Sequence, residues 1–121
     1  MAKPGPRPFA GSVAWSPASD RLVASSPRDG GLALLQWPGL KRVGAVTLKA
    51  DVGGLAFSPS GRHIAACIGN ELVVYDAALT EVARGCGRQE SLTDCVFRSD
   101  QVVVAVGRDV NSGPAVLVLE I

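Results

Sequence analysis

The chain has 121 residues, of which 47% are hydrophobic and 19% are charged, and its formal net charge at pH 7 is +1. This length suits one ordinary domain, and the apolar content excludes a disordered tail. The nearly neutral charge excludes the basic surface that nucleic acids or anionic membranes require, so we expect no nucleic-acid partner and no direct membrane insertion.

Three cysteines, Cys67, Cys86 and Cys95, are present without any CxxC pair. Their odd number and spacing argue against a disulfide framework and against a zinc site, and they favour a reducing compartment. No apolar run has the length of a signal peptide or a membrane span. We therefore expect a cytoplasmic chain without metal or cofactor.

The first repeat of the chain covers about 11–50 and follows a lead-in, 1–10, that three prolines make a poor strand. It contains the segment "VAWSP" and the apolar runs "RLVAS" and "LALLQW". A Ser-Pro turn separates the first two segments, and Asp29 with its following glycines separates the last two. The more polar segment 42–48 is expected to be an outer strand.

The second and third repeats, at about 51–90 and 91–121, follow the same order of segments. The second reads "LAFSPSGR", "RHIAAC", a turn with Asn70, "LVVYD" ending at Asp76, and an outer strand at 81–84. The third reads "CVFRSD", "QVVVAVG", a turn with Asn111, and "AVLVLEI", without a fourth strand.

The repeat period points to one architecture. Setting Trp15 over Phe57 gives an offset of 42 residues, and setting Phe57 over Phe97 gives a further 40. Strand-length apolar runs that recur at this period are typical of propeller blades. We predict an all-β partial β-propeller with two four-stranded antiparallel blades plus three strands of a third.

Such a chain cannot close a ring alone, because propellers close with about four to eight blades. Three interpretations remain. The chain is a fragment that associates with missing blades, a protomer that completes the ring as a homo-oligomer, or an open stack of sheets. The open stack is least favoured because it leaves apolar faces exposed.

Four polar residues are candidates for a structural role in turns or for contacts at a rim: Asp29, Asn70, Asp76 and Asn111. We expect them to brace turns more often than to touch a partner, since such residues are common in turns whatever the function.

No catalytic residue is predicted. The only histidine, His63, would need a partner carboxylate or thiol aimed at it for catalysis, and we expect it instead to cap a turn or face solvent. A propeller hydrolase would need acidic or histidine side chains at the channel positions of the first strands, where we place Val13, Leu55 and Val96. The chain is therefore expected not to be an enzyme.

The repeats resemble WD-repeat propellers. Tyr75-Asp76 stands where that family has its Trp-Asp pair, and we place Trp37 in the same slot of the first repeat and Leu119-Glu120 in that of the third. The match is degenerate, because no copy carries the usual Gly-His pair.

A closer resemblance is carried by "LLQWPGL", "VGGLAFSPSGRHIAACIGNELVVYD" and "LTDCVFRSDQVVVAVGRDVNSGPAVLVLEI". These segments look like middle blades of the endoplasmic-reticulum exchange factors of the COPII small GTPase, the prolactin regulatory element-binding protein family. The resemblance implies a protein partner, namely that GTPase, and a place at the cytosolic face of the endoplasmic reticulum in ER-to-Golgi transport.

Two features of that family are missing. Its exchange activity depends on a Gly- and Lys-rich loop of the first blade, whereas "SSPRDGG" is short and holds no lysine. Its C-terminal membrane helix has no counterpart either. We therefore expect a non-enzymatic interaction module, a fragment without the exchange loop and anchor; the alternative is a generic WD-repeat scaffold fragment of another complex.

Overall fold

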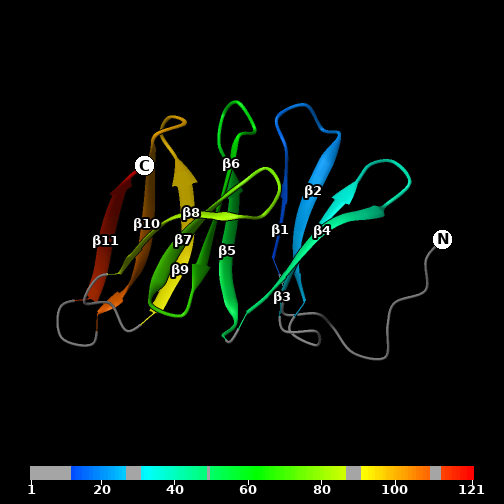
Figure 1. The fold of residues 1–121 in the computed structure, drawn as a ribbon. Helices are drawn as coiled ribbons and strands as arrows, with labels where there is room; N and C mark the ends of the chain where they lie inside the picture. The colour runs from blue at the N-terminus through cyan, green and yellow to red at the C-terminus, as the bar shows by residue number, and fades with distance from the viewer. Residues whose placement is uncertain (1–11, 27–30, 49, 87–90, 110–112) are drawn as a thin grey trace.

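The computed structural model describes residues 12–26, 31–48, 50–86, 91–109 and 113–121. These residues form three antiparallel sheets and no helix, which confirms the predicted fold class (Figure 1). The strands are β1 (Val13–Trp15), β2 (Arg21–Ser26), β3 (Gly31–Gln36), β4 (Lys41–Thr47), β5 (Val52–Phe57), β6 (His63–Ile68), β7 (Glu71–Asp76), β8 (Glu81–Cys86), β9 (Ser91–Phe97), β10 (Val102–Asp109) and β11 (Gly113–Glu120).

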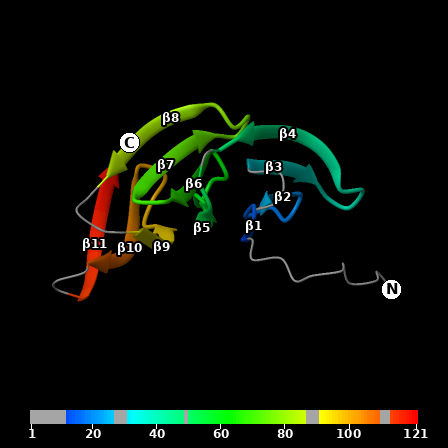
Figure 2. The same cartoon turned by 90° about the horizontal axis from the view of Figure 1, so that it is seen from below.

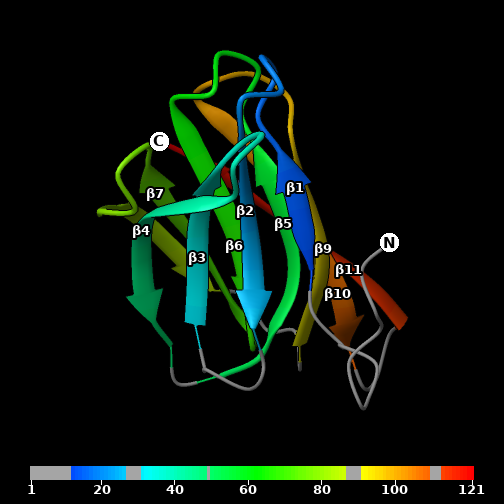
Figure 3. The same cartoon turned by 90° about the vertical axis from the view of Figure 1, so that its right-hand side faces the viewer.

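Each sheet is a meander in which strands adjacent in sequence also pair. The first sheet has the order β1-β2-β3-β4, the middle sheet β5-β6-β7-β8, and the third sheet β9-β10-β11. Figure 3 shows the four strands of the first sheet side by side in this order. Viewed from below, the sheets fan out with β1, β5 and β9 on the inner side and with β4 and β8 on the outer side (Figure 2).

The repeated Ser-Pro segments form the same turn twice. Ser19 in the first sheet has φ 60° and Gly61 in the middle sheet has φ 80°. Each donates its backbone N–H to the carbonyl of the serine three residues earlier, Ser16 or Ser58, at 2.9 Å. Proline at the second turn position fixes φ for this reversal, so the repeated sequence encodes a repeated hairpin.

The opposite turn of the middle sheet is the short connection from β6 to β7. Gly69 has φ 62° there, which glycine adopts without a steric penalty. Its neighbour Asn70 is exposed. The turns predicted around Asp29 and Asn111 lie outside the described residues.

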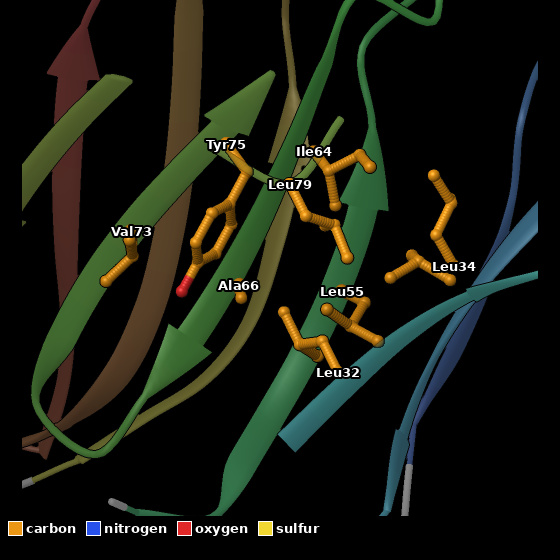
Figure 4. Packing of buried hydrophobic residues seen from close by; sticks show 9 residues of the cluster. Leu32, Leu34, Leu55, Ile64, Ala66, Val73, Tyr75 and Leu79 are labelled. Carbon is orange, nitrogen blue, oxygen red and sulfur yellow. The ribbon is translucent and has the colours of Figure 1, made fainter. Parts of the chain in front are cut away.

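One hydrophobic core lies between the first and the middle sheet (Figure 4). Leu32 and Leu34 of the first sheet face Leu55, Ile64 and Tyr75 of the middle sheet. The other buried members are Val23, Ala66, Val73 and Leu79. This core occupies one face of the middle sheet.

A second core lies on the other face of the middle sheet. It joins Cys67, Leu72 and Val74 to Leu92 and Val103 of the third sheet. Ala65, Cys95 and Ala105 complete its buried residues. The middle sheet is thus covered on both faces, which explains why the apolar runs of β6 and β7 are continuous.

Two glycines allow the inner strands β5 and β9 to approach closely. A Cβ atom on Gly53 would lie 2.5 Å from the Leu92 carbonyl oxygen, and one on Gly54 would lie 2.9 Å from the Asp94 Cα. Both contacts involve backbone that cannot turn away, so larger residues here would force the middle and third sheets apart.

The strand registers identify equivalent residues in the three sheets. The last residues of the first strands pair with Leu22, Ile64 and Val103 on the second strands. These residues in turn pair with Leu35, Tyr75 and Leu119 on the third strands. The first three strands of the three sheets therefore correspond residue by residue at these positions, as the repeats predict.

This equivalence corrects the placement of Trp37. Tyr75 corresponds to Leu35, so the slot of the aromatic-acidic pair in the first sheet holds Leu35 and Gln36. Trp37 lies two residues after Leu35, in the turn that follows β3. The prediction aligned it by its indole ring, whereas strand pairing decides the register.

Candidate interaction surface at the turn rim

One end of the three sheets carries all the turns that follow their first and third strands. Alternate strands of a meander run in the same direction, so these turns share an end. We call this end the turn rim; its residues are 16–20, 37–40, 58–62, 77–80 and 98–101. Asp76 ends β7 at the turn rim, whereas Asn70 precedes β7 at the opposite end, so the structure does not bring these two candidates together.

Asp76 makes two hydrogen bonds within its own turn. Its Oδ1 accepts the backbone N–H of Ala78 and that of Thr80, both at 2.9 Å. The Asp76 N–H donates to the Thr80 carbonyl at 2.8 Å. These contacts are local and order the β7–β8 turn.

Ser58 is the centre of a second polar group on the turn rim. It is fully buried, and its Oγ accepts the backbone N–H of His63 at 3.0 Å. The first sheet repeats this contact, with the N–H of Arg21 donating to Ser16 Oγ at 3.2 Å. A serine before proline therefore closes the turn to the residue five positions later in both sheets.

Asp100 connects this group to the third sheet. Its Oδ1 accepts the Ser60 N–H at 3.0 Å and the Ser60 hydroxyl at 2.8 Å. These hydrogen bonds hold the pKa of Asp100 below its usual value. The equivalent first-sheet link stays local, because the Ser16 hydroxyl donates to Asp20 of the same turn at 2.9 Å.

His63 also spans the two sheets. Its Nδ1 lies 2.8 Å from the Asp100 carbonyl oxygen, which can only accept, so Nδ1 carries a proton. The ring stacks on Phe97, with centroids 6.5 Å apart and planes 16° from parallel. His63 thus caps a turn, as expected, but that turn belongs to the third sheet, so the side chain joins the middle sheet to the third.

Two tryptophans form an exposed pair at the rim of the first sheet. Trp15 and Trp37 meet edge to face, with centroids 5.4 Å apart, and are 48% and 46% exposed. Leu40 in the same turn is 50% exposed. Exposed aromatic side chains with such neighbours are typical of protein-binding surfaces.

The first aromatic residues of the repeats differ in their surroundings. Phe57 and Phe97 pack against the two cores. Trp15 does not, because its side chain lies on the outer face of the first sheet. The sequence missed this difference, since the three residues occupy equivalent positions.

The described residues contain no group of three or more His, Cys, Asp or Glu side chains able to hold a metal ion. Cys67 and Cys95 lie buried in the second core, and the neighbouring Cys67 thiol together with burial raises the pKa of Cys95. A thiol whose pKa is raised in this way is a poor nucleophile. Leu55 packs between two sheets and does not face a channel.

Across the part of the chain that the structure describes, no helix is long and apolar enough to cross a membrane.

Comparisons with known proteins find a likeness in structure alone. No protein-family model matches the sequence, and no curated protein matches it. The crystal structure of the Myceliophteria thermophila Cps50 (Swd1) β-propeller domain superimposes with a TM-score of 0.74 and 13% sequence identity. The alignment covers 93% of this chain and 38% of that chain. The chain thus has the fold of part of a β-propeller, which confirms the predicted partial β-propeller.

Proposed function

We propose that this chain is a non-enzymatic interaction module that binds a protein partner through the turn rim. The observation that carries the proposal is the exposed Trp15–Trp37 pair on a rim whose other turns are fixed by hydrogen bonds. Rigid sheets that present turns to a partner are the usual form of recognition by such folds.

The hydrogen bonds that fix the turns of the turn rim support a role in binding a protein partner. The Asp100 carboxylate joins the turns of the middle and third sheets, and the Asp76 carboxylate orders the β7–β8 turn. Because these turns are held before a partner arrives, little conformational entropy is lost on binding. The two indole rings add a large apolar area next to these fixed turns.

The small GTPase of the COPII coat is our proposed partner. The three segments that resemble the exchange factors of this GTPase support the proposal. They contribute the end of β3 with the turn after it, β5–β7, and nearly all of β9–β11. The fold alone does not select a partner, since it is shared at 13% identity with the Cps50 (Swd1) propeller domain. We propose binding without nucleotide exchange at the cytosolic face of the endoplasmic reticulum, because the segment 25–31 holds no lysine.

The experiment is a binding titration of the chain with the COPII GTPase, in its nucleotide-free and GDP-bound forms. We expect binding, and we expect Trp37→Ala to raise the dissociation constant at least about tenfold, as the loss of an exposed aromatic anchor does. Val43→Ala is the matched control, because Val43 is an equally exposed apolar residue on β4, outside the turn rim.

Absence of binding to both GTPase forms would rule out this partner. The second candidate function, a propeller scaffold module of another assembly, then predicts a different protein whose binding Trp37→Ala weakens. If Val43→Ala weakened binding as much as Trp37→Ala, the indole pair would not be the binding surface.

A further inference from the structure

A close backbone approach between the middle and third sheets lies beside two cysteines. Gly54 of β5 pairs in register with Cys67 of β6, and residues paired in this way point to the same face of a sheet. A Cβ atom on Gly54 would lie 2.9 Å from the Cα atom of Asp94, the residue before Cys95 on β9. The Cys67 side chain therefore points toward β9, next to the position of Cys95.

Both thiols are buried in the second core, where they contact each other. Cys67 is 0% exposed and Cys95 is 8% exposed. The Cys95 thiol donates to the Ala65 carbonyl oxygen at 3.7 Å, and Ala65 lies in the same core as Cys67. A side-chain hydrogen bond joins the two thiols. The two sulfur atoms thus meet across the interface between the middle and third sheets.

The interface between the first and middle sheets has no such pair. By strand register, Ser25 of β2 corresponds to Cys67, and Leu55 of β5 corresponds to Cys95. Packing of the repeats therefore does not require sulfur at these two positions. The facing thiols are a property of one interface and not of the repeat.

We propose that Cys67 and Cys95 form a site of reversible oxidation, at which hydrogen peroxide converts the two thiols into a disulfide between the middle and third sheets. In a reducing compartment the free thiols are the resting state, and disulfides that form there are typically transient or redox-sensing. Once formed, the covalent bond prevents the third sheet from separating from the middle sheet.

The reaction has two steps, and Cys67 reacts first. The hydrogen bond from Cys95 lowers the pKa of Cys67, and the thiolate is the reactive form of cysteine. The Cys67 sulfur attacks one peroxide oxygen, the O–O bond breaks, and the products are a sulfenic acid and one water molecule. The Cys95 sulfur then attacks the Cys67 sulfur, the S–O bond breaks, and a second water molecule leaves. Overall, two protons and two electrons pass from the thiols to the peroxide.

Burial of the two thiols selects the class of oxidant. A bulky disulfide such as oxidised glutathione cannot reach Cys67, whose exposure is 0%. Hydrogen peroxide is little larger than water, and the 8% exposure of Cys95 leaves the pair incompletely sealed. Cys86 is exposed and is open to both kinds of oxidant. We therefore expect peroxide to oxidise all three cysteines, and oxidised glutathione to modify Cys86 alone.

The test is oxidation of the folded wild-type chain with hydrogen peroxide, followed by mapping of the disulfides by mass spectrometry. We expect a Cys67–Cys95 disulfide that dithiothreitol reverses. The control is the same chain unfolded in urea, where the closure of short loops is favoured. Cys86 and Cys95 are nine residues apart, whereas Cys67 and Cys95 are 28 apart, so the unfolded chain should mainly pair Cys86 with Cys95.

Two matched variants separate the buried pair from the exposed cysteine. Cys86→Ala should leave formation of the Cys67–Cys95 disulfide unchanged, and its mass after oxidation should fall by two hydrogen atoms. Cys95→Ala should abolish that loss of mass within the folded monomer. Circular dichroism spectra check that both variants fold, and the comparison of folded and unfolded wild type needs no variant.

Two results would overturn the proposal. One is a folded chain in which peroxide oxidises Cys86 but leaves Cys67 and Cys95 as free thiols. The other is a share of Cys67–Cys95 among the disulfides that is no larger in the folded chain than in urea, since the fold would then not favour the pairing. Neither result bears on binding of the GTPase at the turn rim, which the titration above tests separately.

Discussion

The middle and third sheets carry equivalent residues in opposite environments. Val74 in the middle sheet is fully buried, whereas Val118, its register equivalent and the same residue type, is 57% exposed. The difference arises from the neighbouring sheet and not from the strand itself. In this fold, the composition of a strand shows which of its residues are apolar enough to be buried. Whether they are buried depends on whether another sheet lies beside that face.

The largest expected effect comes from the side chain that fills the contact between these two sheets. Leu72→Ala should lower the free energy of unfolding by about 3 kcal/mol, because it leaves a cavity at a fully buried site. The equivalent change Val116→Ala should lower the free energy of unfolding by no more than about 0.5 kcal/mol, because Val116 is 63% exposed. Urea denaturation measures both, and equal losses would contradict the comparison.

A smaller loss is expected where the backbones of the two sheets approach. Gly54→Ala places a Cβ atom 2.9 Å from the Asp94 Cα, and we expect it to lower the free energy of unfolding by about 2 kcal/mol. Gly44→Ala in the first sheet is the control, because its nearest atom would be at 3.6 Å. Thermal unfolding of the two variants should differ clearly in midpoint.

Loss of the buried hydroxyl comes next. Ser58→Ala removes the acceptor of the His63 N–H, which should lower the free energy of unfolding by about 1 to 2 kcal/mol. Ser16→Ala removes the equivalent acceptor of the first sheet and should cost about the same. Only Ser58→Ala should also disturb the link to the third sheet, which faster hydrogen exchange in β9 and β10 would reveal.

The smallest expected effect is the loss of stability when the Asp100 carboxylate is protonated at low pH. The pKa of Asp100 is held below its usual value in the folded chain, so its contribution to stability is present above the unfolded pKa and is lost as the pH falls through the folded pKa. Asp100→Asn should therefore be less stable than the wild type at pH 7, and the two should converge below about pH 4. Unfolding midpoints that stay equally separated down to low pH would show that the carboxylate does not act through its charge.

Much of the architecture could be predicted from the repeats, and the errors have physical causes. Offsets between Trp15, Phe57 and Phe97 gave three sheets because equivalent strands need equivalent spacing. Trp37 was misplaced because an aromatic residue in a turn resembles one at a strand end. The contact of His63 with Asp100 uses a backbone carbonyl 37 residues away, which leaves no trace in residue types.

Part of the hydrogen bonding at the turn rim could have been predicted from the sequence. Ser16 and Ser58 both precede proline, and both close onto the residue five positions later. That repeat was visible in the sequence and predicts a buried hydroxyl at each turn. Exposure of the Trp15–Trp37 pair could not be predicted, since it depends on what covers the outer face of the first sheet.

The two hydrophobic cores lie on opposite faces of the middle sheet, and each is shared with one neighbour. The molecule is therefore a one-dimensional array in which every sheet is coupled only to the sheets beside it. A change in packing at the third sheet can affect the first sheet only through the middle sheet. A variant that loosens the third sheet should thus leave the tryptophan pair of the first sheet in place.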